Sequence, residues 1–468
     1  MLADDPALWP ATVLLDGYRR RTISPVEATR LALKRIADAN KELNAMNLVD
    51  EEGALASARE SEARWVKGEP KGLLDGVPVT IKDLMLTKGW PTLRGSKNIA
   101  RDQKWEEDAP AVARLRENNV VILGKTTSPE FGWKALGDSP LTGISRNPWK
   151  TDRTPGGSSA GAAVAAAAGM GALHTGTDAG GSIRIPASFC GIVGHKPTYG
   201  RVPQYPPSPF AIVAHAGPMT RTVPDAALMM NVIARPDDRD AYALPPADMD
   251  YTADLEKGVK GMRIAFSPRL GYAKVDPEVA SAVAAAANAF VELGAQVEEA
   301  DPGFESPRDA FYVLWASGGA KIVAGFNPRQ HAAMDPGLVA MAKVGENFSA
   351  RDYLDAEAIR AALILRMNLF HRKYDLLLTP AVAVPALPVA QDLNDPSTEK
   401  HWIDWTPFSY PFNMTRQPAI SVPCGITRAG LPIGLQIVGR LHDDTRVLRA
   451  ARAFETARPF PFPKIKAA

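Results

Sequence analysis

The sequence predicts an α/β fold: a single large domain in which a mixed, twisted β-sheet is covered by α-helices on both faces. A helical pattern over 107–118 precedes the apolar run VVILGKT, and strand, helix and strand patterns follow one another over 261–300. Residues 418–439 have the pattern of two strands joined by an Ala-Gly turn, which predicts antiparallel pairs beside the parallel ones. No repeat, low-complexity linker or charge block divides the chain, so one domain is predicted over residues 1–468.

The first part of this domain, residues 1–70, is predicted to be helical. Ser24 and Glu27 are spaced as a capping box, with proline at the first helical position, and apolar residues follow at helical spacing. A second helix is predicted over 50–67. The next part, residues 71–235, opens with GLLDGVPVTIKDL, whose β-branched run predicts a buried strand that ends near Lys82.

The last part, residues 236–468, is predicted to contribute loops to a substrate pocket. Residues 203–215 of the middle part and residues 383–410 of the last part are rich in proline and aromatic residues and are expected to be ordered surface loops, where pockets tend to be built. The apolar stretch 160–173 is shorter than the roughly 20 residues of a membrane-spanning helix. Since it consists mostly of Ala and Gly, we expect a helix packed closely inside the protein.

The composition excludes several classes of partner. Lys plus Arg at 54 and Asp plus Glu at 52 give a formal charge of +2, which favours neither nucleic acid nor a membrane as partner. Cys190 and Cys424 have no CxxC spacing, so neither a disulfide framework nor a zinc site is expected, and no cofactor or metal is predicted.

The N-terminal segment has acids before its apolar stretch and does not match a secretory signal, so a cytoplasmic location is expected.

Two glycine-serine stretches lie close together: TPGGSSAG at 154–161 and TGTDAGGSIRIP at 175–186. Glycine runs let the backbone turn its N–H groups toward an anion or a developing oxyanion. Two simple turns would explain either stretch alone, but both occur within one short segment. A phosphate-binding loop is disfavoured because neither stretch ends in Gly-Lys-Ser/Thr.

A second alternative is the GxSxG motif of α/β-hydrolases, which residues 157–161 satisfy with Ser159 as the nucleophile. That motif follows a strand directly, whereas the preceding SRNPWKTDRTPG is polar and contains proline. The histidines that such a triad could use are His371, His401 and His442.

These stretches, together with GVPVTIKD upstream, resemble the amidase signature family of serine hydrolases. The resemblance extends to NPWK at 147–150, FCGIVGHKPTYGRVP at 189–203 and QPAISVPCG at 417–425. It implies the amidase signature fold and a Ser-cisSer-Lys triad of Ser182 as nucleophile, Ser158 after a cis peptide bond as relay, and Lys82 as base. It also implies that the backbone N–H groups of Ala179, Gly180 and Gly181 form the oxyanion hole.

The role of Lys82 has a physical requirement, because a lysine with its usual pKa of about 10.4 is no base at neutral pH. Burial at the end of the apolar strand can lower that pKa. An ion pair with the adjacent Asp83 would instead keep the lysine charged. Neighbouring residues on a strand point to opposite faces, so the two side chains are not expected to meet.

Other residues near the triad are expected to support it or to line the pocket. Supporting roles are expected for Gly157, Ser159, Thr177, Asp178 and Arg184. Phe131 and Trp133 fall where the family lines its acyl pocket, and they would favour an apolar or aromatic substrate. Core packing would explain either aromatic residue equally well.

The predicted function is an amidase that hydrolyses the C–N bond of a small, apolar or aryl carboxamide through a Ser182 acyl-enzyme, with esterase or carbamate hydrolase activity besides. A small-molecule amide is the expected partner, and the chain is expected to be a monomer or homodimer. One alternative is the glutaminase subunit of a tRNA-dependent amidotransferase, although the stretch at 124–143 is more similar to general bacterial amidases. The other is an α/β-hydrolase esterase that uses Ser159.

Overall fold

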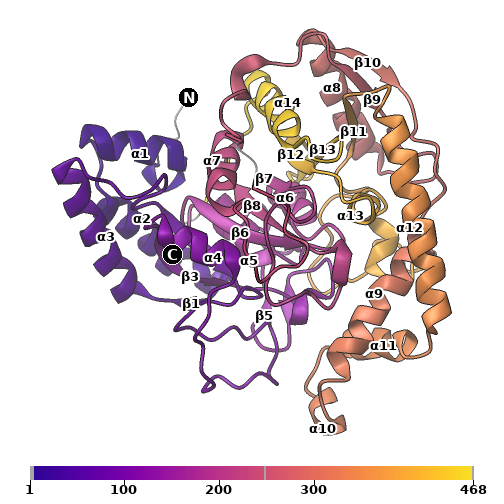
Figure 1. The fold of residues 1–468 in the computed structure, drawn as a ribbon, viewed down its shortest axis with the longest axis horizontal. Helices are drawn as coiled ribbons and strands as arrows, with labels where there is room; N and C mark the ends of the chain where they lie inside the picture. Colours follow the sequence, from indigo (N-terminus) through magenta and orange to yellow (C-terminus); the bar gives the residue numbers. More distant parts are fainter. Residues whose placement is uncertain (1–4, 247–248, 466–468) are drawn as a thin grey trace.

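The computed structural model describes residues 5–246 and 249–465 of the chain, and within these ranges eleven strands form one sheet (Figure 1). Their order is β1-β3-β2-β6-β8-β7-β12-β13-β11-β9-β10. The strands of this sheet are β1 (Met46–Val49), β2 (Pro78–Lys82), β3 (Val121–Thr126), β6 (Leu173–Asp178), β7 (Val193–Lys196), β8 (His215–Thr220), β9 (Arg263–Phe266), β10 (Gln296–Glu299), β11 (Leu376–Pro380), β12 (Ala419–Ile426) and β13 (Pro432–Gly439). A separate two-stranded ribbon consists of β4 (Asp138–Ser139) and β5 (Gly143–Ile144).

The sheet is mixed, as predicted. Strand β2 pairs in parallel with both of its neighbours, β3 and β6, whereas β12 and β13 form an antiparallel hairpin. Parallel pairs also join β9 to β10 and to β11. The α/β fold class is therefore confirmed.

Helices cover both faces of the sheet. In the described part of the chain the α-helices are α1 (Ala11–Arg20), α2 (Pro25–Leu43), α3 (Glu51–Lys67), α4 (Pro110–Glu117), α5 (Ala160–Ala168), α6 (Arg184–Cys190), α7 (Val223–Ile233), α8 (Pro277–Glu292), α9 (Arg308–Val323), α10 (Pro328–His331), α11 (Pro336–Gly345), α12 (Ala350–Phe370), α13 (Tyr410–Met414) and α14 (Asp444–Ala457). Figure 1 shows α1–α3 at one side of the molecule and α9, α11 and α12 at the other, with α5 and α6 between them.

The predicted helix starts are correct to within a few residues. At α2 the capping box is present: the Glu27 N–H donates to Ser24 Oγ at 3.2 Å, and the Ser24 N–H donates to Glu27 Oε2 at 2.7 Å. The helix expected from 107 begins later, with Pro110 in its first turn, because proline fits the first turn of a helix, where the missing N–H costs nothing.

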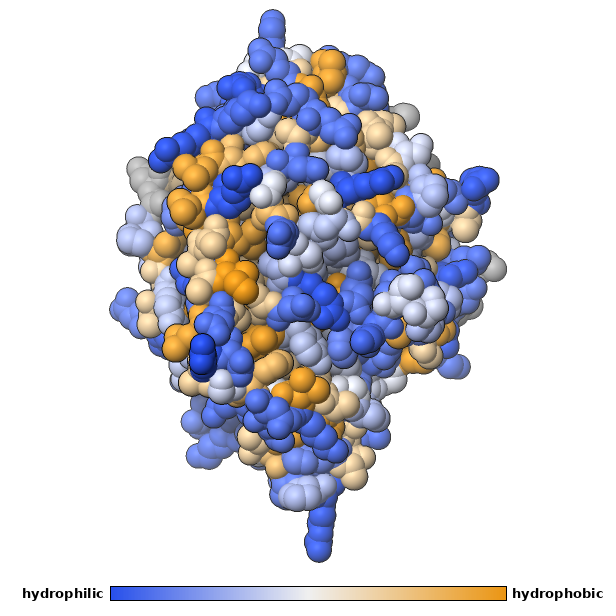
Figure 2. Space-filling model, turned by 90° about the vertical axis from the view of Figure 1, so that its right-hand side faces the viewer, coloured by the Kyte–Doolittle hydropathy of each residue, from blue (hydrophilic) through white to orange (hydrophobic). Residues whose placement is uncertain are grey.

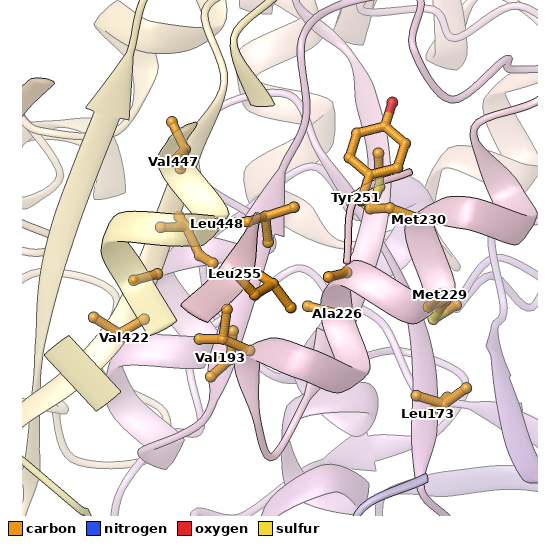
Figure 3. Close-up of a cluster of buried hydrophobic side chains, with 14 of the residues drawn as sticks. Leu173, Val193, Ala226, Met229, Met230, Tyr251, Leu255, Val422, Val447 and Leu448 are labelled. Atoms are coloured by element: carbon orange, nitrogen blue, oxygen red, sulfur yellow. The ribbon is translucent and has the colours of Figure 1, made fainter. Parts of the chain in front are cut away.

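The largest hydrophobic cluster fills the space between one face of the sheet and helices α1, α4, α7, α8 and α14. Figure 3 shows a part of it in which side chains from α7 and α14 meet side chains from three strands. The labelled residues of these elements are Ala226, Met229 and Met230 of α7, Val447 and Leu448 of α14, and Leu173, Val193 and Val422 of the sheet. This packing holds β6 and its neighbours in a fixed position beneath the site described below.

On the other face, α5 is buried along its whole length, as the Ala-Gly composition of the stretch predicts. Gly161 lets the helix approach the chain closely, because a Cβ there would lie 2.2 Å from the carbonyl oxygen of Ala45. No helix in the described ranges combines the length and apolar character that crossing a membrane requires. The outer face that carries α12 mixes polar side chains with separate apolar patches (Figure 2).

Candidate active site

The carboxyl ends of the parallel strands β2 and β6 and the N-terminal ends of α5 and α6 meet at one place. Lys82 is the last residue of β2, and Asp178 is the last residue of β6. Ser158 and Ser159 directly precede α5, while Ser182 lies two residues before α6. In open α/β sheets the carboxyl ends of the strands are the usual position of a binding site.

Lys82 is fully buried, and its Nζ has three hydroxyl partners: Ser158 Oγ, Ser159 Oγ and Thr177 Oγ1, each at 2.8 Å. Burial lowers the pKa of this lysine well below its usual value, and the charge of Asp178 opposes that shift only in part. Asp83 points away, to Lys125 Nζ at 3.1 Å and Asn47 Nδ2 at 2.8 Å. The adjacent carboxylate therefore does not pair with Lys82, as the strand geometry predicted.

The hydrogen-bond geometry fits a neutral amine. Ser159 Oγ lies 3.1 Å from the carbonyl oxygen of Thr177, which can only accept, so the Ser159 hydroxyl donates there and accepts from Lys82. A neutral amine has two N–H donors and one lone pair. If Ser159 and Thr177 accept its two N–H donors, the lone pair of the neutral amine faces the Ser158 hydroxyl, which is the orientation that a base requires.

Ser158 and Ser182 both line one cavity, and the Gly157–Ser158 peptide bond is cis. The two serine loops are joined by a hydrogen bond from the Ser159 N–H to the carbonyl oxygen of Ser182 at 3.1 Å. Ser182 is almost fully buried, yet its hydroxyl has no hydrogen-bond partner among the described residues. A buried but unengaged hydroxyl on a cavity wall is free to interact with a bound molecule.

A buried ion pair between Asp178 and Arg184 supports the loop that carries Ser182. Arg184 Nε and Nη2 each lie 2.9 Å from the Asp178 carboxylate, and Arg184 also donates to Gln436 and Asn413. Burial would raise the pKa of the Asp178 carboxyl, but the charge and hydrogen bonds of Arg184 hold it well below its usual range. Both side chains lie behind the cavity wall, so the pair positions the loop and does not face a bound molecule.

The three N–H groups expected to form an oxyanion hole are not equivalent. The Gly181 N–H donates to Asp178 Oδ1 at 2.8 Å and is already engaged. In the described structure the N–H groups of Ala179 and Gly180 have no acceptor, and Ala179 lines the cavity. Gly180 is tightly enclosed, because a Cβ there would lie 2.9 Å from Phe311 Cζ and 3.1 Å from Trp402 Cη2. These two N–H groups are the ones left to bind an anionic oxygen.

The cavity beside Ser182 has a volume of about 600 Å³ and mostly apolar walls. Phe131 lies on its wall and packs against Phe326 with a ring-centroid distance of 5.7 Å. Trp133 does not lie on this wall. It is buried in the core, where its backbone carbonyl accepts a hydrogen bond from Trp315 Nε1 at 3.0 Å.

Several wall residues were not predicted individually. The proline-rich segment 203–210 forms one wall with Pro203, Pro206, Pro207 and Pro209, and its composition had marked the wider loop as a pocket element. Arg94, Lys321 and Phe326 are also on the wall, but no local pattern indicated them. Residues of the second loop, 383–410, do not line this cavity.

The GxSxG alternative has no support in this geometry. Ser159 is fully buried between Lys82 and the Thr177 backbone, and no strand precedes it directly. In the described residues no histidine contacts its hydroxyl; His371, for example, bonds to the carbonyl oxygen of Tyr374. No group of three or more potential metal ligands occurs in the described part of the chain either.

Comparison with known proteins places the chain in a family. A family model described as Amidase matches residues 27–448. An acylamidase of Rhodococcus erythropolis is 38% identical over 457 residues, which cover 96% of this chain and 95% of that protein. A glutamyl-tRNA(Gln) amidotransferase subunit of Myxococcus xanthus is 37% identical over 470 residues, or 93% and 94% of the two chains.

Among solved structures, a bacterial aryl acylamidase of the amidase signature enzymes superposes with a TM-score of 0.91 at 31% identity, covering 96% of each chain. The chain belongs to the amidase signature family, as its motifs predicted. It is an amidase, a hydrolase acting on C–N bonds.

Proposed function

We propose that this amidase hydrolyses a carboxamide with an apolar or aryl portion through an acyl-enzyme on Ser182. The observation that carries the proposal is the contact of Lys82 Nζ with Ser158 Oγ at 2.8 Å, in a buried site next to a free Ser182 hydroxyl. Similarity to acylamidases supports the choice of substrate, as do the apolar cavity walls.

In the first half of the reaction, neutral Lys82 accepts the proton of Ser158, which accepts the proton of Ser182, as Ser182 Oγ bonds to the amide carbon. The carbonyl oxygen becomes an oxyanion and accepts hydrogen bonds from the Ala179 and Gly180 N–H groups. The proton then passes through Ser158 to the amide nitrogen, the C–N bond breaks and the amine leaves. Water attacks the resulting ester by the same relay, releasing the acid and restoring Ser182.

The first test is a panel of p-nitroanilides, primary amides and aryl carbamates, with the released p-nitroaniline, ammonia or phenol, respectively, as the readout. The wild-type chain is expected to release p-nitroaniline from an apolar acyl anilide, and Ser182→Ala is expected to release none. Equal turnover in both proteins would overturn the assignment of Ser182. Esters are expected to be turned over as well, since they form the same acyl-enzyme, and aryl carbamates are expected to react through a carbamoyl-enzyme on Ser182.

A second candidate is ammonia release from glutamine, favoured by the 37% identity to the amidotransferase subunit of Myxococcus xanthus. Free glutamine carries an α-ammonium group, which needs an acceptor in the site. The cavity wall contains no Asp or Glu among its described residues, so a substrate without an ammonium group fits it better. Glutamine turnover exceeding that of every anilide would reverse this preference.

A further inference from the structure

Two charged side chains lie on the wall of the cavity beside Ser182, and both are cationic: Arg94 and Lys321. All other described residues of that wall are apolar or neutral. The cavity is therefore mainly apolar but carries a net positive charge. The binding of an uncharged, apolar amide does not require that charge.

The Arg94 guanidinium has no hydrogen-bond partner in the described structure. Its backbone is fixed, because its N–H donates to the carbonyl oxygen of Asp83 at 3.1 Å and its own carbonyl oxygen accepts from the Phe131 N–H at 2.7 Å. The Asp83 carboxylate is occupied by Lys125, Asn47 and the Leu93 N–H, and forms no ion pair with the guanidinium. Burial lowers the pKa of Arg94, and the charge of Asp83 opposes that shift only in part, so the cation is held at an energetic cost.

Lys321 lies on α9, one residue before the wall residue Ile322 and five before Phe326. It is exposed, and it forms no ion pair with any described acid. Arg94 also borders a second cavity together with Phe131 and Phe326. Arg94, Phe131 and Phe326 thus line both cavities, at one side of the cavity beside Ser182.

An unpaired guanidinium beside apolar surface is a strong site for a carboxylate, because its planar N–H groups match the two carboxylate oxygens and the low dielectric strengthens the attraction. We propose that Arg94, assisted by Lys321, binds an anionic group on the substrate at the end remote from the scissile bond. The preferred substrates are then amides that carry one carboxylate, joined to the reacting carbonyl by an apolar segment. This inference rests on the proposed amidase reaction at Ser182.

The test compares substrates that differ only in charge. In one series the acyl chain of a p-nitroanilide ends either in a carboxylate or in an isopropyl group of similar size. In a second series the acyl group is kept and the aniline carries either a carboxylate or a methyl group. The charged member of at least one series is expected to have a kcat/KM about 10- to 100-fold above its neutral partner.

The variants identify the side chains responsible. Arg94→Gln is expected to remove most of that charged-to-neutral ratio and Lys321→Gln part of it, whereas Lys97→Gln, an exposed cation three residues from Arg94 and off the cavity wall, is expected to leave the ratio unchanged. Because the readout is a ratio within each variant, a general loss of folding does not imitate the result. Raising the salt concentration is expected to reduce the ratio.

Two outcomes overturn the inference: a ratio near one in both series, or a ratio that Arg94→Gln leaves unchanged. Failure of the proposed function looks different. In that case the neutral anilides are not hydrolysed by the wild-type chain, or they are hydrolysed equally by Ser182→Ala.

Discussion

The backbone N–H of Ser159 donates to the carbonyl oxygen of Ser182 at 3.1 Å. This bond joins the loop before α5 to the loop before α6, so the proposed relay serine and the proposed nucleophile lie on segments that are fixed to each other. Lys82 adds a second link, because its Nζ contacts Ser158 and Ser159 on the loop before α5 and Thr177 on β6, the strand that leads into the loop before α6. The site is a set of interlocked backbone and side-chain contacts, and changes to either loop are expected to affect the other.

Lys82→Ala is expected to lower kcat for an anilide by about 100- to 10,000-fold, because the base that accepts the Ser158 proton is lost. Lys82→Arg is expected to be equally inactive, since a guanidinium stays charged at neutral pH. Steady-state kinetics check this, with circular dichroism to confirm folding. Full activity of Lys82→Ala would contradict the proposed base.

The pH dependence follows from the lowered pKa of Lys82. The protonated lysine cannot accept a proton, so kcat/KM is expected to rise as pH increases through the pKa of the folded protein and then stay level. Because burial moves that pKa down, the level region is expected to include neutral pH. A profile that keeps rising to above about pH 10, the usual range of an exposed lysine, would contradict this assignment.

A fluorophosphonate probe is expected to label Ser182, because its hydroxyl lines the cavity and has no hydrogen-bond partner among the described residues. Ser182→Ala is expected to abolish labelling. Ser159→Ala is expected to retain it at a reduced rate, since that change removes one partner of Lys82 and leaves the nucleophile in place. Peptide mapping that found the label on Ser159 would revive the α/β-hydrolase alternative.

Gly180→Ala is expected to lower kcat by about 100-fold or more, which is the effect that loss of one oxyanion-hole donor has in other hydrolases. The added Cβ would meet Phe311 Cζ at 2.9 Å, so the loop must shift and its N–H groups turn away from the cavity. Gly68→Asn is a suitable control. That glycine caps α3 in a left-handed conformation, its surroundings are open, and asparagine tolerates the backbone, so unchanged kinetics are expected.

Asp178→Asn is expected to reduce the free energy of unfolding by about 3 to 5 kcal/mol, because it leaves the buried Arg184 charge unpaired. The folded-state pKa of Asp178 lies below its unfolded value, so the stabilisation is complete above about pH 4 and is lost as pH falls through the folded pKa. Urea unfolding of both proteins at several pH values measures this difference.

The control is Asp16→Asn, which breaks the exposed pairs of Asp16 with Arg19 and Arg20 and is expected to cost less than about 1 kcal/mol. Equal losses for the buried and the exposed carboxylate would show that Asp178 does not hold the loop.

Most features of the fold that depend on residues close together in the chain could be predicted from the sequence. The capping box of α2, the buried end of β2 at Lys82 and the buried Ala-Gly helix α5 each follow from residues that are close in the chain. Alternation along a strand also predicted that Asp83 points away from Lys82, toward Lys125. Such features need no knowledge of how distant segments meet.

The cavity wall could not be predicted in the same way. Phe131 and Trp133 are two positions apart, but Phe131 and Gly132 both have positive φ, 52° and 72°, and this turn sends one ring to the cavity and the other to the core. Positive φ is uncommon for a phenylalanine, so no propensity indicates it. Arg94 and Phe326 reach the same wall from segments more than 200 residues apart, and only the assembled fold brings them together.

The four prolines of segment 203–210 have a consequence for how this amidase could acquire new substrates. Proline fixes its own φ and restricts the residue before it, so this wall has little backbone freedom to lose when a molecule binds. The shape of this wall is therefore largely fixed before the substrate binds. Laboratory evolution of the substrate range is therefore expected to proceed through exchange of the side chains at Gln204, Tyr205, Ser208 and Phe210, while the path of the backbone between them stays the same.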